Sequence, residues 1–289
     1  MRPCIIGESV RGASHARSGK ECQDSWGYKT IERCGSVALA VADGHGSEAC
    51  PHSKIGSSIA IYTFCDIIER FCRNDMARAG SLYTFLNREG EVAVAKSIEA
   101  EWKRRVLKWH FGSACQPDRR EDRSSIFVKY GSTLAGLLLT PEFFFALQIG
   151  DGNIVFLDDS GLKPVIFPDK ILGNETYSLS RVHSWKNVMC LTGWRNVGKG
   201  VPHAYMLSTD GFLNSFVSTA EYERSCLEYY AMIKEHGAAE VAKNLKNWLQ
   251  ETSEMGCGDD ISVLFYTTPR GGGRSLARRV PESGRGMVK

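Results

Sequence analysis

Aspartates recur at the ends of apolar runs in this sequence. Four of them follow or precede such a run, each beside a glycine: Asp43, Asp151, Asp210 and Asp259. Carboxylates that are brought together repel one another, so such a group must bind protons or hold a cation. Mg²⁺ and Mn²⁺ are hard cations that take oxygen ligands of this kind. The pattern therefore predicts a metal site, provided that the fold brings the ends of these runs together.

For each aspartate alone, a hairpin turn is the alternative explanation. Asp-Gly is a common dipeptide of tight hairpin turns, because both residues tolerate a positive φ angle. A turn does not need a carboxylate at every strand end, however, and four such positions together favour a shared site. The set contains no cluster of Cys and His, which argues against zinc.

Two kinds of periodicity indicate the elements that must position these acids. Apolar residues at helical spacing predict helices over 53–73, 91–109, 220–235 and 238–252. Short apolar runs predict strands over 37–42, 133–139, 143–149, 154–157, 188–191, 204–207 and 261–266. A segment of mixed charge over 112–125 is predicted to be a solvated loop. Because the strands follow one another and the helices come in pairs, we expect an α+β fold of antiparallel sheets covered by helical hairpins.

Composition and charge limit the class of protein. The chain has 289 residues, of which 43% are hydrophobic and 24% charged, as is typical of a globular protein. Lys and Arg number 36 against 33 Asp and Glu, and the resulting charge of +3 does not favour a nucleic-acid partner. No apolar run is long enough to span a membrane. The ten cysteines are scattered without a Cys-x-x-Cys pair, which favours a reducing compartment and a cytoplasmic location.

The last part of the chain differs in composition from the rest. From Pro269 onward it holds six basic residues and one acid, and it is rich in Gly and Arg. We therefore divide the chain into one domain over 1–268 and a basic tail over 269–289, which is predicted to be disordered. A docking arm for an acidic partner or nucleic acid is the alternative role for this tail.

Six short motifs extend the pattern of aspartates along the chain. They are Gln23-Asp24-Ser25, Asp43-Gly44-His45-Gly46, Gly131-Ser132-Thr133, Gly150-Asp151-Gly152, Asp210-Gly211-Phe212 and Asp259-Asp260-Ile261-Ser262-Val263. In order and spacing they resemble the motifs of the metal-dependent PPM-type Ser/Thr phosphatases, which are similar to protein phosphatase 2C. The segments Ser14-His15 and 174–179 resemble a bacterial branch of that family. The resemblance implies a four-layer αββα sandwich, in which helical pairs cover two antiparallel sheets.

The resemblance also implies an activity, its cofactors and its partners. It implies hydrolysis of phosphoserine and phosphothreonine in a phosphoprotein, by attack of a hydroxide that bridges two Mg²⁺ or Mn²⁺ ions. A Ser/Thr kinase that the phosphatase opposes is the implied partner. Two ions about 3.5–4 Å apart lower the pKa of a shared water from about 15.7 toward about 7.

Family roles carry over to individual positions of this chain. The metal positions correspond to Asp43, Gly44, Asp210, Asp259, Asp24 and Asp151. Of these, the resemblance implies that Asp43 bridges the two ions, that Asp24 acts through water, and that Asp151 helps to hold a weaker third ion. His45 corresponds to the acid that protonates the leaving alkoxide, a role that suits an imidazole near pH 7.

At three positions the chain departs from the family pattern. Gln23 stands where many members have a metal-binding Glu, Gly19 where the family commonly has an Arg that contacts the substrate phosphate, and Asp260 where Asn is usual. The candidates to replace the phosphate contact are His15 and Lys20. We interpret a third neighbouring cation, Arg17, as a solvated charge.

The departures leave two questions open. Asp260 either strengthens cation binding or faces solvent. The changes at Gln23 and Gly19 are compatible with a second interpretation of the whole protein. In that interpretation it is a catalytically weak relative that binds a phosphoprotein or a kinase without turnover.

Overall fold

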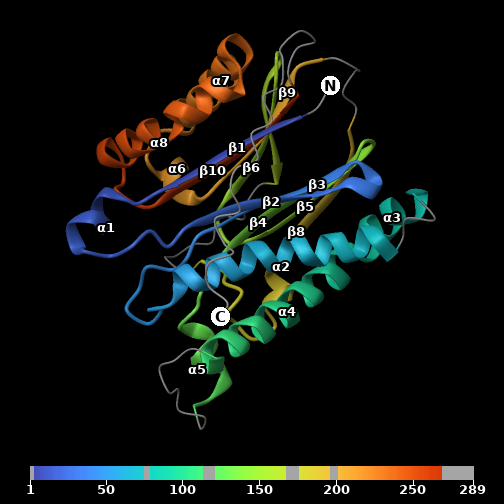
Figure 1. The fold of residues 1–289 in the computed structure, drawn as a ribbon, viewed down its shortest axis with the longest axis vertical. Coiled ribbons are helices and arrows are strands. Elements are labelled where there is room, and N and C mark those ends of the chain that lie inside the picture. Colours follow the sequence, from blue (N-terminus) through green and yellow to red (C-terminus); the bar gives the residue numbers. More distant parts are fainter. Residues whose placement is uncertain (1–2, 75–78, 113–120, 167–175, 196–200, 269–289) are drawn as a thin grey trace.

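Two antiparallel sheets of five strands form the centre of the computed structural model, which describes residues 3–74, 79–112, 121–166, 176–195 and 201–268. Helices cover the outer face of each sheet (Figure 1). This is the predicted αββα sandwich, and the fold class is confirmed.

Sheet A has the strand order β1-β10-β9-β6-β7. Its strands are β1 (Cys4–Val10), β6 (Asn153–Asp158), β7 (Gly161–Ile166), β9 (His203–Ser208) and β10 (Ile261–Thr268). Sheet B has the order β2-β3-β4-β5-β8. Its strands are β2 (Ser25–Ile31), β3 (Ser36–Ala42), β4 (Leu134–Leu139), β5 (Phe143–Ile149) and β8 (Met189–Trp194).

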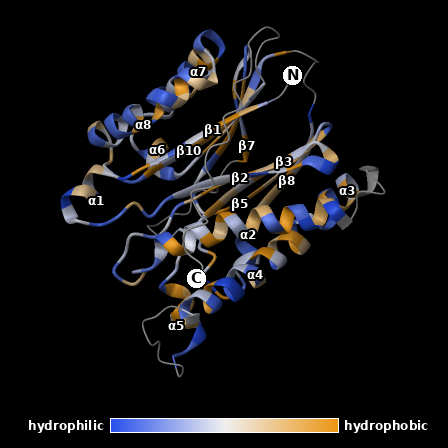
Figure 2. Cartoon of the chain, in the orientation of Figure 1, coloured by the Kyte–Doolittle hydropathy of each residue, from blue (hydrophilic) through white to orange (hydrophobic). Residues whose placement is uncertain are grey.

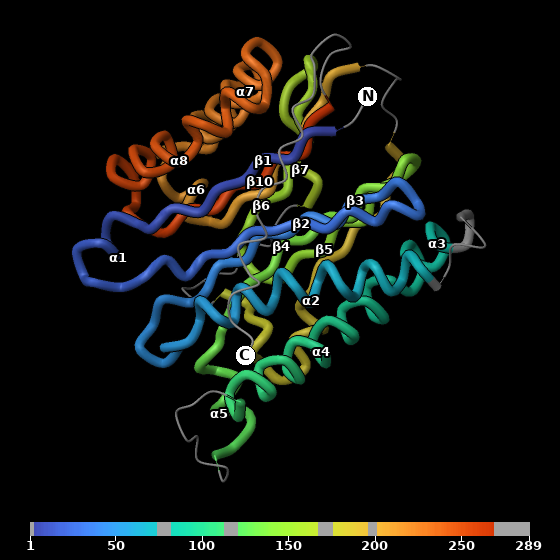
Figure 3. The backbone as a smooth tube through the Cα atoms, viewed as in Figure 1, coloured from blue at the N-terminus to red at the C-terminus, as the bar shows by residue number. Residues whose placement is uncertain are grey.

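Two helix pairs make the outer layers. The helices α2 (Ser53–Asn74) and α4 (Glu91–Gly112) pack over sheet B, and α7 (Thr219–His236) and α8 (Ala238–Met255) pack over sheet A (Figures 1 and 3). Shorter helices are α1 (Ala13–Ser18), α3 (Ala79–Phe85), α5 (Arg123–Val128) and α6 (Asp210–Asn214), with a π-helical turn at Leu86–Gly90 and 3₁₀ turns at Glu32–Cys34 and Ser184–Asn187. No helix in the described ranges is both long enough and apolar enough to cross a membrane.

Three groups of buried apolar side chains hold the layers together. One lies between the two sheets, and the others lie between each sheet and its helix pair. The strand β3 is buried at every residue because it has sheet A on one face and α2 on the other. The helices present polar residues outward, and the strands between the layers are largely apolar (Figure 2).

The sequence-based predictions hold for the four long helices, for the six central strands and for one edge strand, β8. The strands β1, β2 and β7 were not predicted, and all three are edge strands. An edge strand has solvent on one side, so polar residues and even a proline such as Pro164 are tolerated there, and the apolar pattern is lost.

The predicted loop over 112–125 is wrong at both ends. Gly112 ends α4, and α5 begins at Arg123. The Asp122 carboxylate caps α5 by accepting hydrogen bonds from the backbone amides of Ser124 and Ser125, at 2.9 and 3.2 Å. Short polar side chains before a helix serve this purpose, so the charged segment contains a helix start rather than only a loop. Residues 113–120 lie outside the described residues, as does the predicted tail over 269–289.

Candidate active site

The register of the strands brings the predicted acids to one rim of the sandwich. In sheet B, Ser25 pairs with Ala42, so Asp24 and Asp43 are neighbours just beyond the paired residues. In sheet A, Val263 pairs with Ser208, which places the end of β9 beside the start of β10. The Thr209 hydroxyl joins the two sheets at this rim by donating a 2.6 Å hydrogen bond to Asp24 Oδ2.

None of the four acid positions is a hairpin turn. Asp43 leads from β3 toward α2, Asp210 begins α6, and Asp259 lies between α8 and β10. Asp151 links β5 to β6, which belong to different sheets. The alternative explanation for the Asp-Gly pattern is therefore wrong for this chain.

Asp43 lies at the centre of the rim. Its backbone amide donates to Thr133 Oγ1, and its carbonyl oxygen accepts from the Thr133 amide, both at 2.9 Å. Burial raises the pKa of the Asp43 carboxyl well above its ordinary value, and the charges of Asp24, Asp210 and Asp259 raise it further. These carboxyls therefore lie close enough to repel one another.

Two neighbours of Asp43 have raised pKa values as well. Burial raises the pKa of Asp24 to about 8, although the bond from Thr209 opposes the rise. Burial, together with the charges of Asp151 and Asp259, raises the pKa of Asp210 to about 7. In the absence of a cation these side chains hold protons near neutral pH.

Asp151 reaches the same site from the link between the sheets. Gly150 before it has a φ of 98°, a left-handed conformation that glycine adopts without strain. The Thr176 hydroxyl donates a 2.7 Å hydrogen bond to Asp151 Oδ2. The Asp151 charge acts on both Asp210 and His45, so this fifth acid shares the site.

Gly44 and His45 are held by the loop that precedes β4. Gly44 forms an isolated antiparallel bridge with Ser132, and the His45 amide donates to Gly131 O at 3.1 Å. A Cβ atom on Gly44 would lie 2.7 Å from Gln23 O, so only glycine fits. Burial lowers the pKa of the His45 imidazole, while the Asp151 carboxylate opposes this shift.

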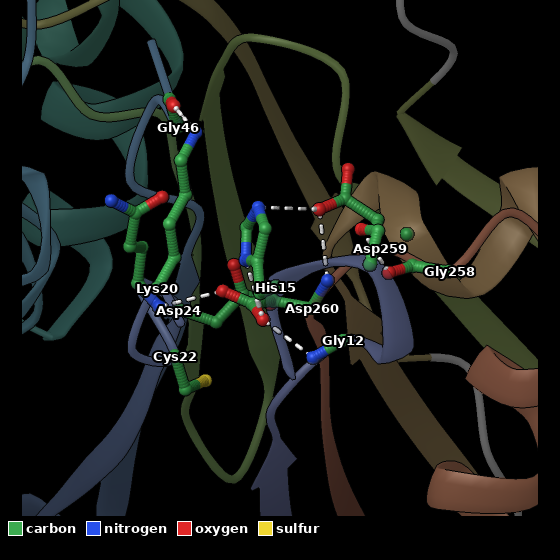
Figure 4. Close-up of polar contacts among 12 residues, drawn as sticks. Gly12, His15, Lys20, Cys22, Asp24, Gly46, Gly258, Asp259 and Asp260 are labelled. Atoms are coloured by element: carbon green, nitrogen blue, oxygen red, sulfur yellow. Dashed lines mark hydrogen bonds and ion pairs between the residues drawn. The ribbon is translucent and has the colours of Figure 1, made fainter. Parts of the chain in front are cut away.

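Asp260 is buried and does not face solvent. Its two carboxylate oxygens accept hydrogen bonds from the amides of Gly12 and Gln23, each at 2.6 Å. Oδ1 also lies 2.9 Å from His15 Nδ1, and His15 Nε2 is 3.9 Å from Asp259 Oδ1 (Figure 4). Asp260 thus fastens the segment before β2 to the start of β10, and it places His15 beside a predicted metal ligand.

The structure gives a reason for the missing arginine. Gly19 ends α1 in the left-handed conformation, with a φ of 74°, where an arginine would be strained. Lys20, the next residue, donates from Nζ to Gly46 O at 2.7 Å, so it reaches the loop that follows His45. Both candidate phosphate contacts, His15 and Lys20, therefore lie at the rim (Figure 4).

The donors present here fit Mg²⁺ or Mn²⁺. The side chain of Gln23 is buried, and its Oε1 has no hydrogen-bond partner, which leaves a free hard oxygen donor on the residue that precedes Asp24. Within the described ranges, no three His, Cys, Asp or Glu side chains converge on a single point as ready-made ligands. Mg²⁺ is commonly held by one or two carboxylates with water completing its shell, and such an arrangement suits this rim.

Sequence reasoning missed two contributors to the site. Thr209 is not among the predicted site residues, yet its hydroxyl donates to Asp24 and also accepts from the Ser262 amide at 2.9 Å. The charge of Arg181 adds to the lowering of the His45 pKa, so this exposed residue lies near the imidazole. Neither residue stands in a motif, and only the fold places them here.

The sequence profile of the protein phosphatase 2C family matches residues 11–250 of the chain. No curated protein sequence matches it. The chain is similar in fold to the catalytic domain of the serine/threonine phosphatase PstP in complex with two manganese ions. That alignment has 16% identity and a TM-score of 0.56, and it covers 91% of this chain and 97% of PstP.

Two further bacterial structures have a similar fold. A serine/threonine phosphatase of S. agalactiae aligns with 14% identity and a TM-score of 0.58, over 92% of this chain and 99% of that one. PppA, a key regulatory component of the T6SS in Pseudomonas aeruginosa, aligns with 17% identity and a TM-score of 0.55, over 92% and 97%. At these identities the likeness concerns the fold. Together with the profile match over most of the sequence, it leads to one conclusion: this chain belongs to the protein phosphatase 2C family, as its motifs predict.

Proposed function

We propose that this protein is a metal-dependent Ser/Thr phosphatase that hydrolyses phosphoserine and phosphothreonine in protein substrates. One observation carries the proposal. Acids from both sheets, Asp24, Asp43, Asp210 and Asp259, meet at one rim with raised pKa values at three of them and with His45 beside them. A fold gains no stability from crowding carboxylates, so the cluster is best explained by a charge that it binds.

The acids have distinct parts in this proposal. Asp43, the Gly44 carbonyl, Asp210 and Asp259 would hold the first cation, and Asp43 would also serve the second. Asp24 would act through water, and Asp151 would contribute to a weaker third position. When bound, two Mg²⁺ or Mn²⁺ ions lower the pKa of a water and neutralise charge on the phosphoryl group.

The remaining groups act on the phosphate ester itself. His45 gives a proton to the serine or threonine oxygen as the bond to phosphorus breaks, and its lowered pKa makes the imidazolium a readier donor. His15 and Lys20 contact the substrate phosphoryl oxygens in place of the missing arginine. Asp260 is the residue that holds His15 in position.

The proposed partners follow from this chemistry. The substrate is a phosphoprotein, and a Ser/Thr kinase supplies the phosphate that is removed. No disulfide joins two cysteines in the part of the chain that the structure describes, which is compatible with the reducing cytoplasm.

An activity assay on two substrates tests the proposal. p-Nitrophenyl phosphate and a phosphothreonine peptide are each incubated with the protein in Mn²⁺ and in EDTA. We expect turnover in Mn²⁺ only. The Asp43→Asn variant should lose at least about 100-fold in activity, since removal of this shared charge weakens the binding of both ions. Asp158→Asn, a change at a distant strand end, serves as the control and keeps full activity.

The same samples decide between the enzyme and the catalytically weak binding module. Calorimetry gives the Mn²⁺ affinity of the wild-type protein. A protein that binds Mn²⁺ and still turns over neither substrate, or one that binds no metal at all, would refute the phosphatase and favour the binding module.

A further inference from the structure

The segment after Thr176 forms one side of the candidate site. Thr176 bonds Asp151 at 2.7 Å, and the Leu179 amide donates to Ser132 O at 2.9 Å. Ser132 is itself the bridge partner of Gly44. The chain that leaves Leu179 therefore starts within the site and leads outward from it.

Two side chains of α4 fix the course of this segment. Lys103 Nζ donates to Arg181 O at 2.8 Å, and Glu99 accepts from the Trp185 amide at 2.9 Å. Glu99 and Lys103 also pair with each other at 2.5 Å, so the charge of each is used internally. The side chains that the segment presents outward are thus held in a defined arrangement against the helix.

The surface made by this segment and α4 is positive. Residues 176–190 include no Asp or Glu. Arg181 and Lys186 are exposed, and so is Lys96 on α4. The ammonium groups of Lys96 and Lys186 lie 4.3 and 5.7 Å from the centre of the Trp185 ring. Neither lysine forms an ion pair with any residue that the structure describes, so both charges are available. We call Lys96, Arg181, Trp185 and Lys186 the basic wall.

The basic wall begins at the site, where the charge of Arg181 acts on His45, and it continues along α4 through Trp185 and the two lysines; the site itself is otherwise acidic. An acidic peptide would be repelled by the aspartates at the rim, while the wall attracts it along one side. We propose that the basic wall binds acidic side chains that flank the phosphorylated residue of a protein substrate. This inference rests on the proposed function, and it adds a preference among phosphoproteins.

Two phosphothreonine peptides test the preference. They are identical except that Asp and Glu flank the phosphothreonine in one, and Asn and Gln in the other. We expect the wild-type protein to favour the acidic peptide in kcat/KM by about three- to tenfold, the range for a few exposed ion pairs, and to lose the preference at about 0.5 M salt. The double variant Lys96→Glu with Lys186→Glu should abolish or reverse this preference for the acidic peptide. The change should appear in KM, while kcat and the turnover of p-nitrophenyl phosphate stay the same.

Matched variants separate charge from structure. The double variant Lys96→Arg with Lys186→Arg should keep the preference, and so should Lys246→Glu, an exposed lysine on α8 over the other sheet. Equal kcat/KM for the two peptides in the wild-type protein would overturn the inference, as would an unchanged preference in the Glu double variant.

A binding measurement keeps the inference independent of catalysis. Fluorescence anisotropy gives the affinity of each labelled peptide, and we expect the same order and the same loss in the Glu double variant. If no substrate is turned over, the proposed function fails while the affinities still decide the role of the wall. An RNA oligonucleotide that binds as tightly as the acidic peptide would show a general polyanion surface and overturn the assignment to protein substrates.

Discussion

At the scale of single residues, the rim combines charge with burial, and bound protons or a bound cation relieve the resulting repulsion. Asp24 is buried and has a pKa of about 8, yet Thr209 donates a hydrogen bond that favours its charged form. The hydroxyl of Thr209 is in turn fixed by the amide of Ser262. The residues around Asp24 thus orient its carboxylate as a hydrogen-bond acceptor, although burial disfavours the negative charge of that carboxylate. Protons and cations compete for such a group, and the orientation is useful only to a cation.

His45 has a role that two substrates can separate. Replacing His45 with Ala should slow a phosphothreonine peptide by about 10²–10⁴-fold, because the alkoxide of threonine needs a proton as it leaves. p-Nitrophenolate is a stable leaving group, so p-nitrophenyl phosphate should lose far less. Steady-state kinetics on both substrates measures the difference. The control is His236→Ala, at the end of α7. Equal losses on the two substrates would remove His45 from the role of acid.

Asp260 is predicted to be an anchor that asparagine cannot replace. Its carboxylate accepts from two backbone amides, whereas a carboxamide has one acceptor oxygen and would turn an N–H toward the second amide. Asp260→Asn should therefore cost about 1–3 kcal/mol of unfolding free energy, measured by urea titration in EDTA. Asp259→Asn, at an exposed neighbour, should cost less than about 0.5 kcal/mol. If the two variants unfold alike, the anchor role is wrong.

At the scale of elements, sequence predicts the buried ones and misses three of the four edge strands of the two sheets; β8, with its apolar run, is the edge strand that it predicts. Strands such as β3 and β4 are covered on both faces, and their unbroken apolar runs are visible in the sequence. The edge strands β1 and β2 carry polar residues that face water, and no pattern separates them from loops. The aspartates were found because strand ends are predictable. The positions of Thr209 and Arg181 depend on contacts between elements far apart in the chain, and short-range patterns do not report these.

The contact between α2 and the loop before β4 is predicted to depend on one glycine. A Cβ atom on Gly56 would lie 1.8 Å from the carbonyl oxygen of Tyr130, and that carbonyl precedes the residue that holds the His45 amide. Gly56→Ala should cost about 3 kcal/mol or more, since the backbone must move to admit the methyl group. Gly112→Ala in α4 has no atom within 4 Å and should be neutral or stabilising by up to about 1 kcal/mol.

Thermal and urea unfolding compare the two glycine variants. Activity adds a second measure, because displacement of Tyr130 should also displace His45. A Gly56→Ala protein that is as stable as Gly112→Ala would contradict the close approach of these elements.

At the scale of the whole molecule, the sandwich brings two acidic edges together. Sheet B supplies Asp24 and Asp43, and sheet A supplies Asp210 and Asp259. The apolar layer between the sheets fixes their separation, so the acids cannot move apart without loss of the core. The free energy gained by burying the apolar core therefore holds the carboxylates close together in spite of their mutual repulsion. A cation that binds there acts on the stability of the entire fold, because it removes a repulsion that both sheets share.

This linkage predicts an unusual dependence of stability on pH. In the unfolded chain the aspartates have a pKa near 3.8, whereas folding raises the pKa of Asp210 to about 7 and of Asp24 to about 8. The folded protein then binds more protons than the unfolded chain, so stability in EDTA should fall as pH rises from about 6.5 toward about 8, by up to about 1.4 kcal/mol per pH unit for each extra proton that the folded protein holds, and it should level off above about 8.5. The histidines with lowered pKa values, His45, His52 and His203, are already neutral in this window.

Saturating Mn²⁺ should remove the trend, because the metal-bound folded protein, like the unfolded chain, then holds no protons on these acids. Mn²⁺ at a concentration 100 times its dissociation constant adds about 2.7 kcal/mol to the free energy of unfolding. Its affinity rises with pH as the competing protons leave the carboxylates. The midpoint of thermal unfolding, measured across this pH range in EDTA and in Mn²⁺, gives the pH dependence of stability without and with the metal. The double variant Asp24→Asn with Asp210→Asn should show a much shallower fall in EDTA, because amides do not titrate and only Asp43 keeps a strongly raised pKa among these three acids. A midpoint in EDTA that climbs with pH would mean that the acids of the two sheets do not share one charged rim.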